Sequence, residues 1–377
     1  MNREKDAPPG RPWGRIMKQD KISMRQLLVL LFSAILSPAI QILPARGAEL
    51  AGRAGWLSTL FALPVLLGLC WVFFALQRAA GEGEGLAGAF RAVLGTAGGK
   101  ALTAVYLAWG VVMLSAGARR CALRILSTGY RNAALPLFIV LLLGAALWMG
   151  RGRLPALARA GEIFYLALSA VLALTVFFSL FNVEARNVLP IWVGDLPAAL
   201  RATLPALSVL GYAVFAAFLG GGVVPREDNR GRGMRWAAAA CLVLTAMQFA
   251  CLGNFGPELV GRMDTPFFSM AEGLGLEGAF QRAESVVVAL WVFSDLALLG
   301  LLVFSCRAMA GSLLGPSIER YSPYVIVALA LAGALFLFPD AFSLTAFLDR
   351  WATAGNLVLG FVVPLLVFLL GKLRRKV

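Results

Sequence analysis

Histidine is absent from this 377-residue chain, and several kinds of chemistry are absent with it. Without histidine there is no Ser-His-Asp or Cys-His catalysis and no histidine-containing metal site. None of the five cysteines forms a Cys-x-x-Cys pair, and no two carboxylates stand at a spacing that suggests hydrolysis. The sequence therefore predicts a protein that is not an enzyme, with no cofactor and no bound metal.

Charged residues are also scarce: they make up 14% of the chain, against about 25% in soluble domains, while 60% of the residues are hydrophobic. The apolar residues form ten blocks of 18 to 24 residues, and only the eighth contains a charge, Asp295. About 20 apolar residues cross a bilayer as a helix, which satisfies its own backbone groups. The blocks are Gln26–Ala45, Ala54–Gln77, Ala101–Ala118, Asn132–Gly150, Ile163–Val183, Ala202–Pro225, Trp236–Pro257, Ser285–Cys306, Tyr321–Pro339 and Trp351–Gly371.

The blocks predict an all-α integral membrane protein with ten transmembrane helices in one domain, residues 22–371. Residues 1–21 are expected to be a disordered basic tail without a cleavable signal peptide, and residues 372–377 a basic C-terminus. The net charge of +14 could indicate nucleic-acid binding, but Lys and Arg concentrate in alternate connections, starting with the N-terminal tail. That distribution predicts a multi-pass cell-membrane protein with both termini in the cytoplasm. Affinity for anionic membrane lipid is a by-product, and no nucleic-acid partner is expected.

Ten helices suggest a five-plus-five inverted repeat, the design of many secondary transporters, in which corresponding helices of the two halves are broken near the binding site. The first block contains Ser37-Pro38 and Pro44, and the sixth contains Pro205, Gly211 and three glycines at 220–222. We therefore expect broken helices 1 and 6. Prolines also occur in other blocks, so plain kinks are the alternative.

A few polar side chains lie inside the blocks. Asp295 predicts a proton or cation site, or a contact for a ligand amine; the alternative is an acid that only hydrogen-bonds a neighbouring helix. Tyr106 and Tyr212 are either packing residues or substrate contacts. Three arginines, Arg119, Arg120 and Arg124, extend the third block and are expected to reach the outer interface, unless one turns inward and meets a carboxylate.

Two connections are expected to be structured. Residues 86–94 predict a short interfacial helix before the third block, and residues 258–284 predict a cap on the outer side.

Short motifs in a collinear order give the chain a resemblance to a known family. They are Ile22-Ser-Met-Arg-Gln26, Leu43-Pro44-Ala-Arg, Ala51-Gly-Arg-Ala-Gly-Trp56, Ala160-Gly-Glu162, Phe255-Gly-Pro-Glu258, Thr265-Pro266 and the stretch from Arg282-Ala-Glu284 to Trp291. Together they resemble the permease-like B subunits of spore germinant receptors, in the amino acid–polyamine–cation transporter superfamily, from about residue 20 to residue 370.

The resemblance implies the five-plus-five fold with spans one and six unwound, in the inner membrane of the spore. It also implies a small germinant, often an amino acid, and two partners: an A-type membrane subunit and a lipoprotein C subunit. Ligand binding would trigger ion release. The expected site lies between spans one, three, six and eight, with candidate contacts Ser37, Pro38, Ala39, Ile40, Tyr106, Gly211, Tyr212 and Asp295.

Span one departs from the family pattern, in which a glycine-rich turn offers backbone N–H groups to a ligand carboxylate. Here the turn reads Ser37-Pro38-Ala39-Ile40, and Pro38 has no N–H. This favours a different or less polar ligand over a standard α-amino-acid carboxylate site. Two other functions stay open: a proton-coupled amino-acid or cation permease, and a scaffold that binds no ligand.

Overall fold

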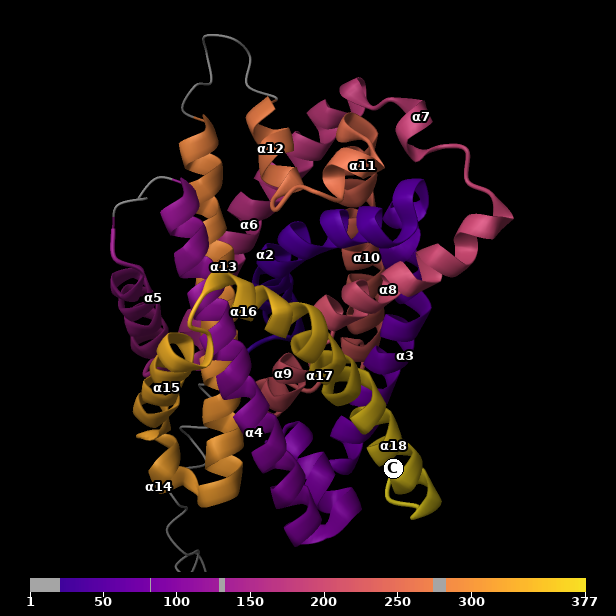
Figure 1. The fold of residues 1–377 in the computed structure, drawn as a ribbon. Coiled ribbons are helices and arrows are strands. Elements are labelled where there is room, and N and C mark those ends of the chain that lie inside the picture. Colours follow the sequence, from indigo (N-terminus) through magenta and orange to yellow (C-terminus); the bar gives the residue numbers. More distant parts are fainter. Residues whose placement is uncertain (1–20, 82, 129–132, 274–282) are drawn as a thin grey trace, which may run out of the picture.

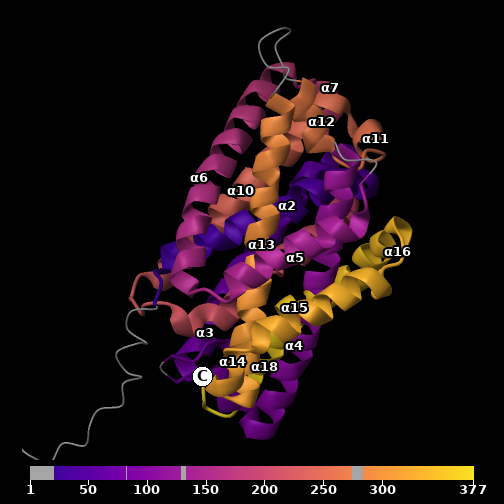
Figure 2. The same ribbon diagram turned by 90° about the vertical axis from the view of Figure 1, so that its left-hand side faces the viewer.

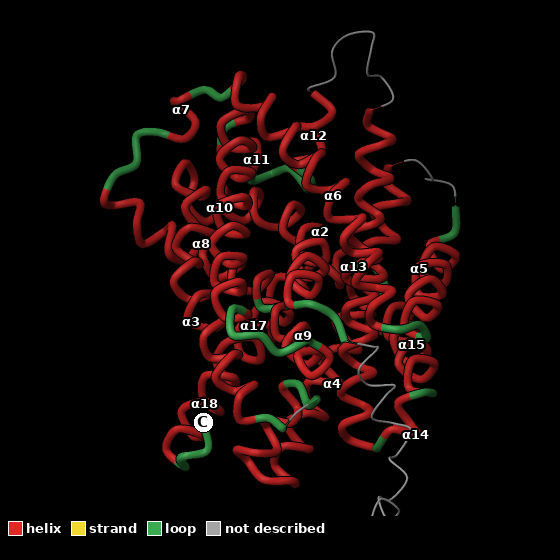
Figure 3. Tube along the Cα trace, turned by 180° about the vertical axis from the view of Figure 1, so that it is seen from behind, coloured by secondary structure: helices red, strands yellow, loops and turns green. Residues whose placement is uncertain are grey.

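The computed structural model describes residues 21–81, 83–128, 133–273 and 283–377, and in these ranges the chain is built of helices and loops (Figures 1 and 3). The only β feature there is one isolated bridge, between Ile22 and Val223. The main helices are α2 (Met24–Ala51), α3 (Ser58–Ala79), α4 (Leu86–Thr128), α5 (Leu135–Gly150), α6 (Leu154–Ser179), α8 (Leu196–Leu210), α9 (Ala213–Phe218), α10 (Asn229–Phe255), α13 (Ala283–Leu314), α15 (Ser322–Ala332) and α18 (Val363–Leu373).

Shorter helical pieces connect them. These are η1 (Gly52–Leu57), η2 (Leu180–Asn182), α7 (Ala185–Val188), η3 (Val193–Asp195), η4 (Leu219–Gly222), α11 (Pro257–Val260), α12 (Pro266–Gly273), α14 (Pro316–Glu319), η5 (Gly333–Leu337), α16 (Ala341–Ala346), η6 (Phe347–Ala352), α17 (Thr353–Leu357) and η7 (Val358–Val362). The three segments η5, η6 and η7 are π-helical. Of these, η5 lies in the ninth apolar block, η7 lies in the tenth, and η6 lies mostly in the connection between the two.

The distribution of apolar and polar side chains between the surface and the interior is that of a membrane protein. Seven helical stretches in the described residues are long and apolar enough to cross a bilayer, the first of them containing both α2 and α3, and two shorter apolar helices accompany them. Large apolar side chains cover the outside: Phe336, Phe342 and Trp148 each expose about four fifths of their surface. Polar side chains such as Ser37, Gln248 and Asp295 are buried instead. The all-helical, multi-pass prediction is confirmed.

The molecule has two distinct ends (Figures 1 and 2). The C-terminus and α14 lie at one end, and α7, α11 and α12 lie at the other. The predicted cap is therefore helical in its described part, although residues 274–282 lie outside the described ranges. The predicted disordered tail, apart from Lys21, also lies outside them.

The start of α2 is set by its own sequence. Ser23 and Gln26 form a capping box, in which the Ser23 hydroxyl accepts from the Gln26 N–H and the Gln26 amide oxygen accepts from the Ser23 N–H. From Met24 the helix continues to Ala51 through both Pro38 and Pro44. The predicted break in the first helix is therefore wrong as a gap in secondary structure. What the prolines change is the hydrogen bonding inside the helix, described below.

The sixth block is interrupted as predicted. α8 ends at Leu210 and α9 starts at Ala213, so Gly211 and Tyr212 form a turn between two helical pieces. The glycine is required there because a Cβ would lie 2.9 Å from the carbonyl oxygen of Asn356. The three glycines at 220–222 end this segment, where Gly222 accepts from the Ile22 N–H at 2.8 Å.

The predicted interfacial helix is present as the first part of α4. Gly95 has a φ of 82°, which separates a short helix from the long third span. The C-terminal tail fastens this short helix: Arg374 donates to the Val93 carbonyl at 3.0 Å, and Lys376 donates to the Ala92 carbonyl at 2.8 Å. Basic side chains thus satisfy carbonyls that the kink leaves without helical partners.

Close backbone packing holds the turn after α2. A Cβ on Gly55 would lie 2.4 Å from the backbone of Gly47, so only glycine allows η1 to fold against the end of α2. We predict that Gly55→Ala lowers the stability of the protein by about 1 to 3 kcal/mol through overpacking. Gly68→Ala, in the middle of α3 with open space around its Cβ, is the control and should be neutral or stabilising. Thermal unfolding in detergent measures both; equal effects would contradict the packing argument.

Candidate functional site

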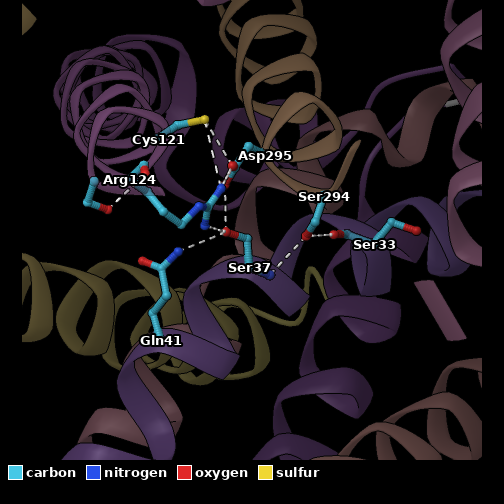
Figure 4. A network of polar contacts seen from close by, with 8 residues as sticks. Ser33, Ser37, Gln41, Cys121, Arg124, Ser294 and Asp295 are labelled. Carbon is cyan, nitrogen blue, oxygen red and sulfur yellow. Dashed lines mark hydrogen bonds and ion pairs between the residues drawn. The ribbon is translucent and has the colours of Figure 1, made fainter. Parts of the chain in front are cut away.

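Asp295 lies at the centre of a buried polar cluster that joins α2, α4 and α13 (Figure 4). Its side chain is 4% exposed and forms an ion pair with Arg124 of α4. The other carboxylate contacts are hydrogen bonds: the Ser37 hydroxyl donates at 2.5 Å, and the Cys121 thiol at 2.9 Å. Arg124 also donates to the Ser37 hydroxyl at 3.1 Å. Asp295, Arg124 and Ser37 therefore each contact the other two, and each of them comes from a different helix.

Ser294, the neighbour of Asp295, enters the hydrogen-bond ladder of α2. Its hydroxyl donates to the Ser33 carbonyl at 2.5 Å and accepts from the Ser37 N–H at 2.9 Å. Ser33 and Ser37 are the acceptor and donor of one helical i→i+4 pair. A side chain inserted at that point is a recognised cause of helix distortion, and the next residue, Pro38, has no N–H to donate. The first helix is therefore opened at one turn without being interrupted.

Two of the three α4 arginines, Arg119 and Arg124, turn inward, which corrects the prediction that they reach the outer interface. Arg124 is 9% exposed and meets Asp295, the outcome that the sequence left as the alternative. Arg119 is 5% exposed and donates to the carbonyls of Ala334 and Pro339, both at 2.8 Å. These carbonyls lie at the end of the ninth block, where η5 stops and leaves acceptors free.

The turn between α8 and α9 faces a second polar group, Asn356 of α17. Asn356 is buried, accepts from the Trp109 indole N–H at 3.0 Å and donates to the Ser208 carbonyl at 3.2 Å. Sequence analysis missed Asn356, although it is an amide inside an apolar block and that signal could have singled it out.

The predicted site residues do not all lie at one depth. Ser37 and Asp295 are in direct contact, and Pro38, Ala39 and Ile40 follow as buried residues of α2. Tyr106 is separate: it lies fifteen residues before Cys121 on α4, which is about 22 Å along a helix.

The surroundings of Tyr106 are those of a packing residue. Its hydroxyl donates to the Leu359 carbonyl at 2.5 Å, and its ring packs on Phe90 and Phe218. A ligand contact for Tyr106 stays a prediction, as it does for the other candidate residues.

The chemistry at this centre is that of binding and charge exchange. Asp295 can hold a proton or pair with a cation, and Arg124 can pair with an anion. The Ser37 hydroxyl and the Cys121 thiol contact both of these side chains and can hydrogen-bond to either one. The five cysteines are free and buried. Within the described ranges no group of three His, Cys, Asp or Glu side chains is placed to hold a metal ion.

A cavity of about 780 Å³ opens at the end of the molecule that carries Lys21 and α14. Basic side chains from five different segments line it, namely Lys21, Arg91, Lys100, Arg153 and Arg307. Its two acids are paired with arginines of the same wall: Glu84 lies 2.9 Å from Arg91, and Glu319 lies 3.4 Å from Arg307. The cavity therefore has an excess of positive charge.

Comparison with known proteins gives the family. The sequence model of one family, described as "Spore germination protein", matches residues 21–339. The chain belongs to the spore germination protein family. A search of curated proteins gives no match.

Among solved structures, this spore germination protein resembles the one described as "Substrate-bound outward-open state of a Na+-coupled sialic acid symporter reveals a novel Na+-site". The TM-score is 0.55 at 11% sequence identity, over 92% of this chain and 80% of the symporter chain. At that identity the likeness shows a shared transporter fold and nothing about the ligand.

The ion pair at the centre of the cluster leads to a stability prediction. Asp295→Asn leaves the Arg124 guanidinium buried without its carboxylate, and we expect a loss of about 3 to 5 kcal/mol. Removing both charges, with Arg124→Gln and Asp295→Asn together, should restore most of that loss, because neither member of this ion pair then remains as a charge without the other. A double-mutant cycle of unfolding in detergent measures the coupling. A double variant as unstable as the sum of the single variants would rule out the pairing.

Proposed function

We propose that this chain is the membrane subunit of a spore germinant receptor that binds a small, amino-acid-like nutrient and helps to trigger germination by ion release. Membership of the spore germination protein family supports the setting. The observation that carries the binding role is the buried cluster of Ser37, Arg124 and Asp295, since ionisable groups inside a membrane are costly and mark functional sites.

The proposed architecture is ten transmembrane helices in a five-plus-five inverted repeat. It is supported by helices in all ten apolar blocks, by the interruption of the sixth at Gly211 and Tyr212, and by the transporter-fold likeness. The opened turn of α2 at Ser33–Ser37 would play the part of the first broken helix. The protein would lie in the inner membrane of the spore, beside an A-type subunit and a lipoprotein C subunit. Both of its termini would lie in the cytoplasm.

In this proposal the ligand binds where the opened turn of α2 faces α4, α13 and the turn of the sixth block. The α2 contacts are Ser37, Pro38, Ala39 and Ile40, the sixth block contributes Gly211 and Tyr212, and Asp295 is the contact for a ligand amine. Tyr106, fifteen residues before Cys121 on α4, would be a further ligand contact. A ligand group that takes the place of one member of the ion pair would loosen the link between α2, α4 and α13. That loosening is the proposed signal.

The alternative is a proton-coupled amino-acid or cation permease, and the likeness to a symporter favours it. The two functions differ in whether substrate accumulates. Uptake of radiolabelled amino acids into proteoliposomes that contain this chain alone separates them. The receptor proposal expects binding without concentrative uptake, and a gradient-driven accumulation would make the permease the correct description.

A germination assay tests the receptor role. In spores that lack this chain, the wild-type protein should restore the response to its nutrient, whereas the double variant Arg124→Gln and Asp295→Asn should not, because it folds without the charged contacts. Asp195→Asn, at a half-buried helix cap outside the proposed site, is the matched control and should restore the response. Release of ions and loss of refractility are the readouts. A full response from the double variant would contradict the proposed site.

The ion pair also makes a prediction about coupling ions. Because Arg124 already neutralises Asp295, a sodium ion at this carboxylate would have to displace a tethered guanidinium. We expect ligand affinity at fixed ionic strength to change by less than about twofold when Na⁺ is replaced by K⁺, well under 1 kcal/mol. Isothermal titration in the two salts measures this, and a strict Na⁺ requirement would contradict the prediction.

A further inference from the structure

The basic cavity at the α14 end of the molecule is separate from the cluster around Asp295. None of the residues that line it belongs to that cluster. Arg307, which lines the cavity, follows Asp295 by twelve residues on α13, which is about 18 Å along the helix. The cavity and the proposed germinant site therefore lie at different depths, and the proposed function gives the cavity no role.

Close backbone packing fixes one wall of the cavity. A Cβ on Gly85 would lie 2.2 Å from the Phe218 carbonyl oxygen, and a Cβ on Gly221 would lie 2.3 Å from the Gly83 carbonyl oxygen. All four residues line the cavity. The connection before α4 and the end of the sixth block thus touch through their backbones, which only glycine permits at these two positions.

The start of the first span is fastened to the same wall. Ile22 forms a β-bridge with Val223, in which the Ile22 N–H donates to the Gly222 carbonyl at 2.8 Å and the Val224 N–H donates to the Ile22 carbonyl at 2.9 Å. The residue before Ile22 is Lys21, which is half-buried and lines the cavity. An ordered backbone therefore places the Lys21 side chain, and the cavity is part of the fold without a ligand.

The cations of the cavity outnumber its acids among the described residues. Each of the two acids is paired with an arginine of the same wall. Lys21 and Lys100 have no side-chain hydrogen bond or ion pair within the described ranges, and Arg153 adds a further positive charge. Like charges gathered around one space repel each other, and an anion bound among them would turn that repulsion into attraction.

Two helices also begin at this cavity. α4 starts at Leu86, between the lining residues Gly85 and Ala87, and α6 starts at the lining residue Leu154. The first backbone N–H groups of a helix lack intrahelical partners and carry partial positive charge. These helix ends therefore add to the positive potential of the basic side chains.

A phosphate group suits this arrangement better than a carboxylate does. It carries a charge of about −1.5 to −2 at pH 7 and has three strong acceptor oxygens, which can take donors from several directions. A carboxylate has only two oxygens, both in one plane. The basic side chains come from five segments around the cavity, and the volume of about 780 Å³ is that of a small-molecule site.

We propose that this cavity binds a phosphate-bearing anion, held by Lys21 and Lys100, either as a soluble phosphate compound or as the headgroup of an anionic phospholipid. The inference goes beyond the proposed function and is tested without a germinant. It also differs from a general attraction between anionic lipid and the basic end of the protein. That attraction would act on every exposed lysine alike, whereas the site depends on these two.

Anion titrations of the purified full-length chain in detergent at pH 7 and fixed ionic strength test the inference. The probes are inorganic phosphate and glycerol 3-phosphate, with acetate and chloride for comparison. Short-chain phosphatidylglycerol and phosphatidylcholine are the lipid probes. We expect a phosphate-bearing probe to bind at least about 10-fold more tightly than acetate, and phosphatidylglycerol is the probe with that role if the occupant is a lipid.

Lysine variants with equal changes in net charge localise the binding. Lys21→Gln and Lys100→Gln should each weaken it by about 3- to 10-fold, and Lys21→Arg should keep it within about twofold. Lys372→Gln is the matched control, because Lys372 is exposed on α18 at the same end and does not line this cavity. Its effect should be under about 1.5-fold. Since the two cavity lysines have no partner in the described ranges, their Gln variants should keep or raise the Tm without ligand.

Two results would overturn the inference. One is binding of every phosphate-bearing probe no tighter than that of acetate or chloride. The other is a loss of binding in Lys372→Gln as large as in Lys21→Gln, which would show a diffuse attraction in place of a site. A failure of the germination assay would leave the inference untouched, since the anion titrations do not depend on a germinant.

Native mass spectrometry distinguishes the two sources of the phosphate. Retention of phosphatidylglycerol over phosphatidylcholine by the wild-type chain, lost in Lys21→Gln and kept in Lys372→Gln, identifies a lipid headgroup. Binding of glycerol 3-phosphate with the same dependence on Lys21, but without selective lipid retention, identifies a soluble compound. Either result supports the site.

Discussion

The cost of burying charge away from water governs the centre of this protein. A carboxylate inside the membrane needs a matched partner, and the structure gives Asp295 one from Arg124, with hydrogen bonds from Ser37 and Cys121 added. Because the members come from α2, α4 and α13, electrostatic matching also fixes how three helices pack. These polar groups link the three helices, and they are the groups that the proposed ligand would contact.

The need to satisfy buried polar groups with hydrogen bonds also explains the irregular helices. Two places where a backbone bond is opened have a substitute partner: Ser294 serves both ends of the opened turn in α2, and Asn356 serves the Ser208 carbonyl beside the turn of the sixth block. In a bilayer an unsatisfied backbone group has no water to turn to, so such turns survive only with partners of this kind. Each substitute is a side chain from another helix, so a shift of that helix would break the hydrogen bond that the backbone group receives from it.

Family membership and fold likeness carry different information. The family match covers most of the chain and gives a biological setting, spore germination, whereas the structural likeness at 11% identity gives only the transporter architecture. Transporter folds can serve as receptors because the same alternating contacts that move a substrate can report its presence. The choice between these uses depends on the contacts that a ligand makes at the site.

The amino-acid sequence alone determined the membrane class, the ten helical blocks, the interruption near Gly211 and the presence of one acid, Asp295, inside a block. These depend on block length, charge and glycine or proline content, all local properties of the chain. Only the tertiary structure decided that Arg119 and Arg124 turn inward, that α2 stays helical through Pro38, and that Asn356 matters. Their partners are 87 to 261 residues away in sequence, and a side chain's direction depends on which distant group is there to meet it.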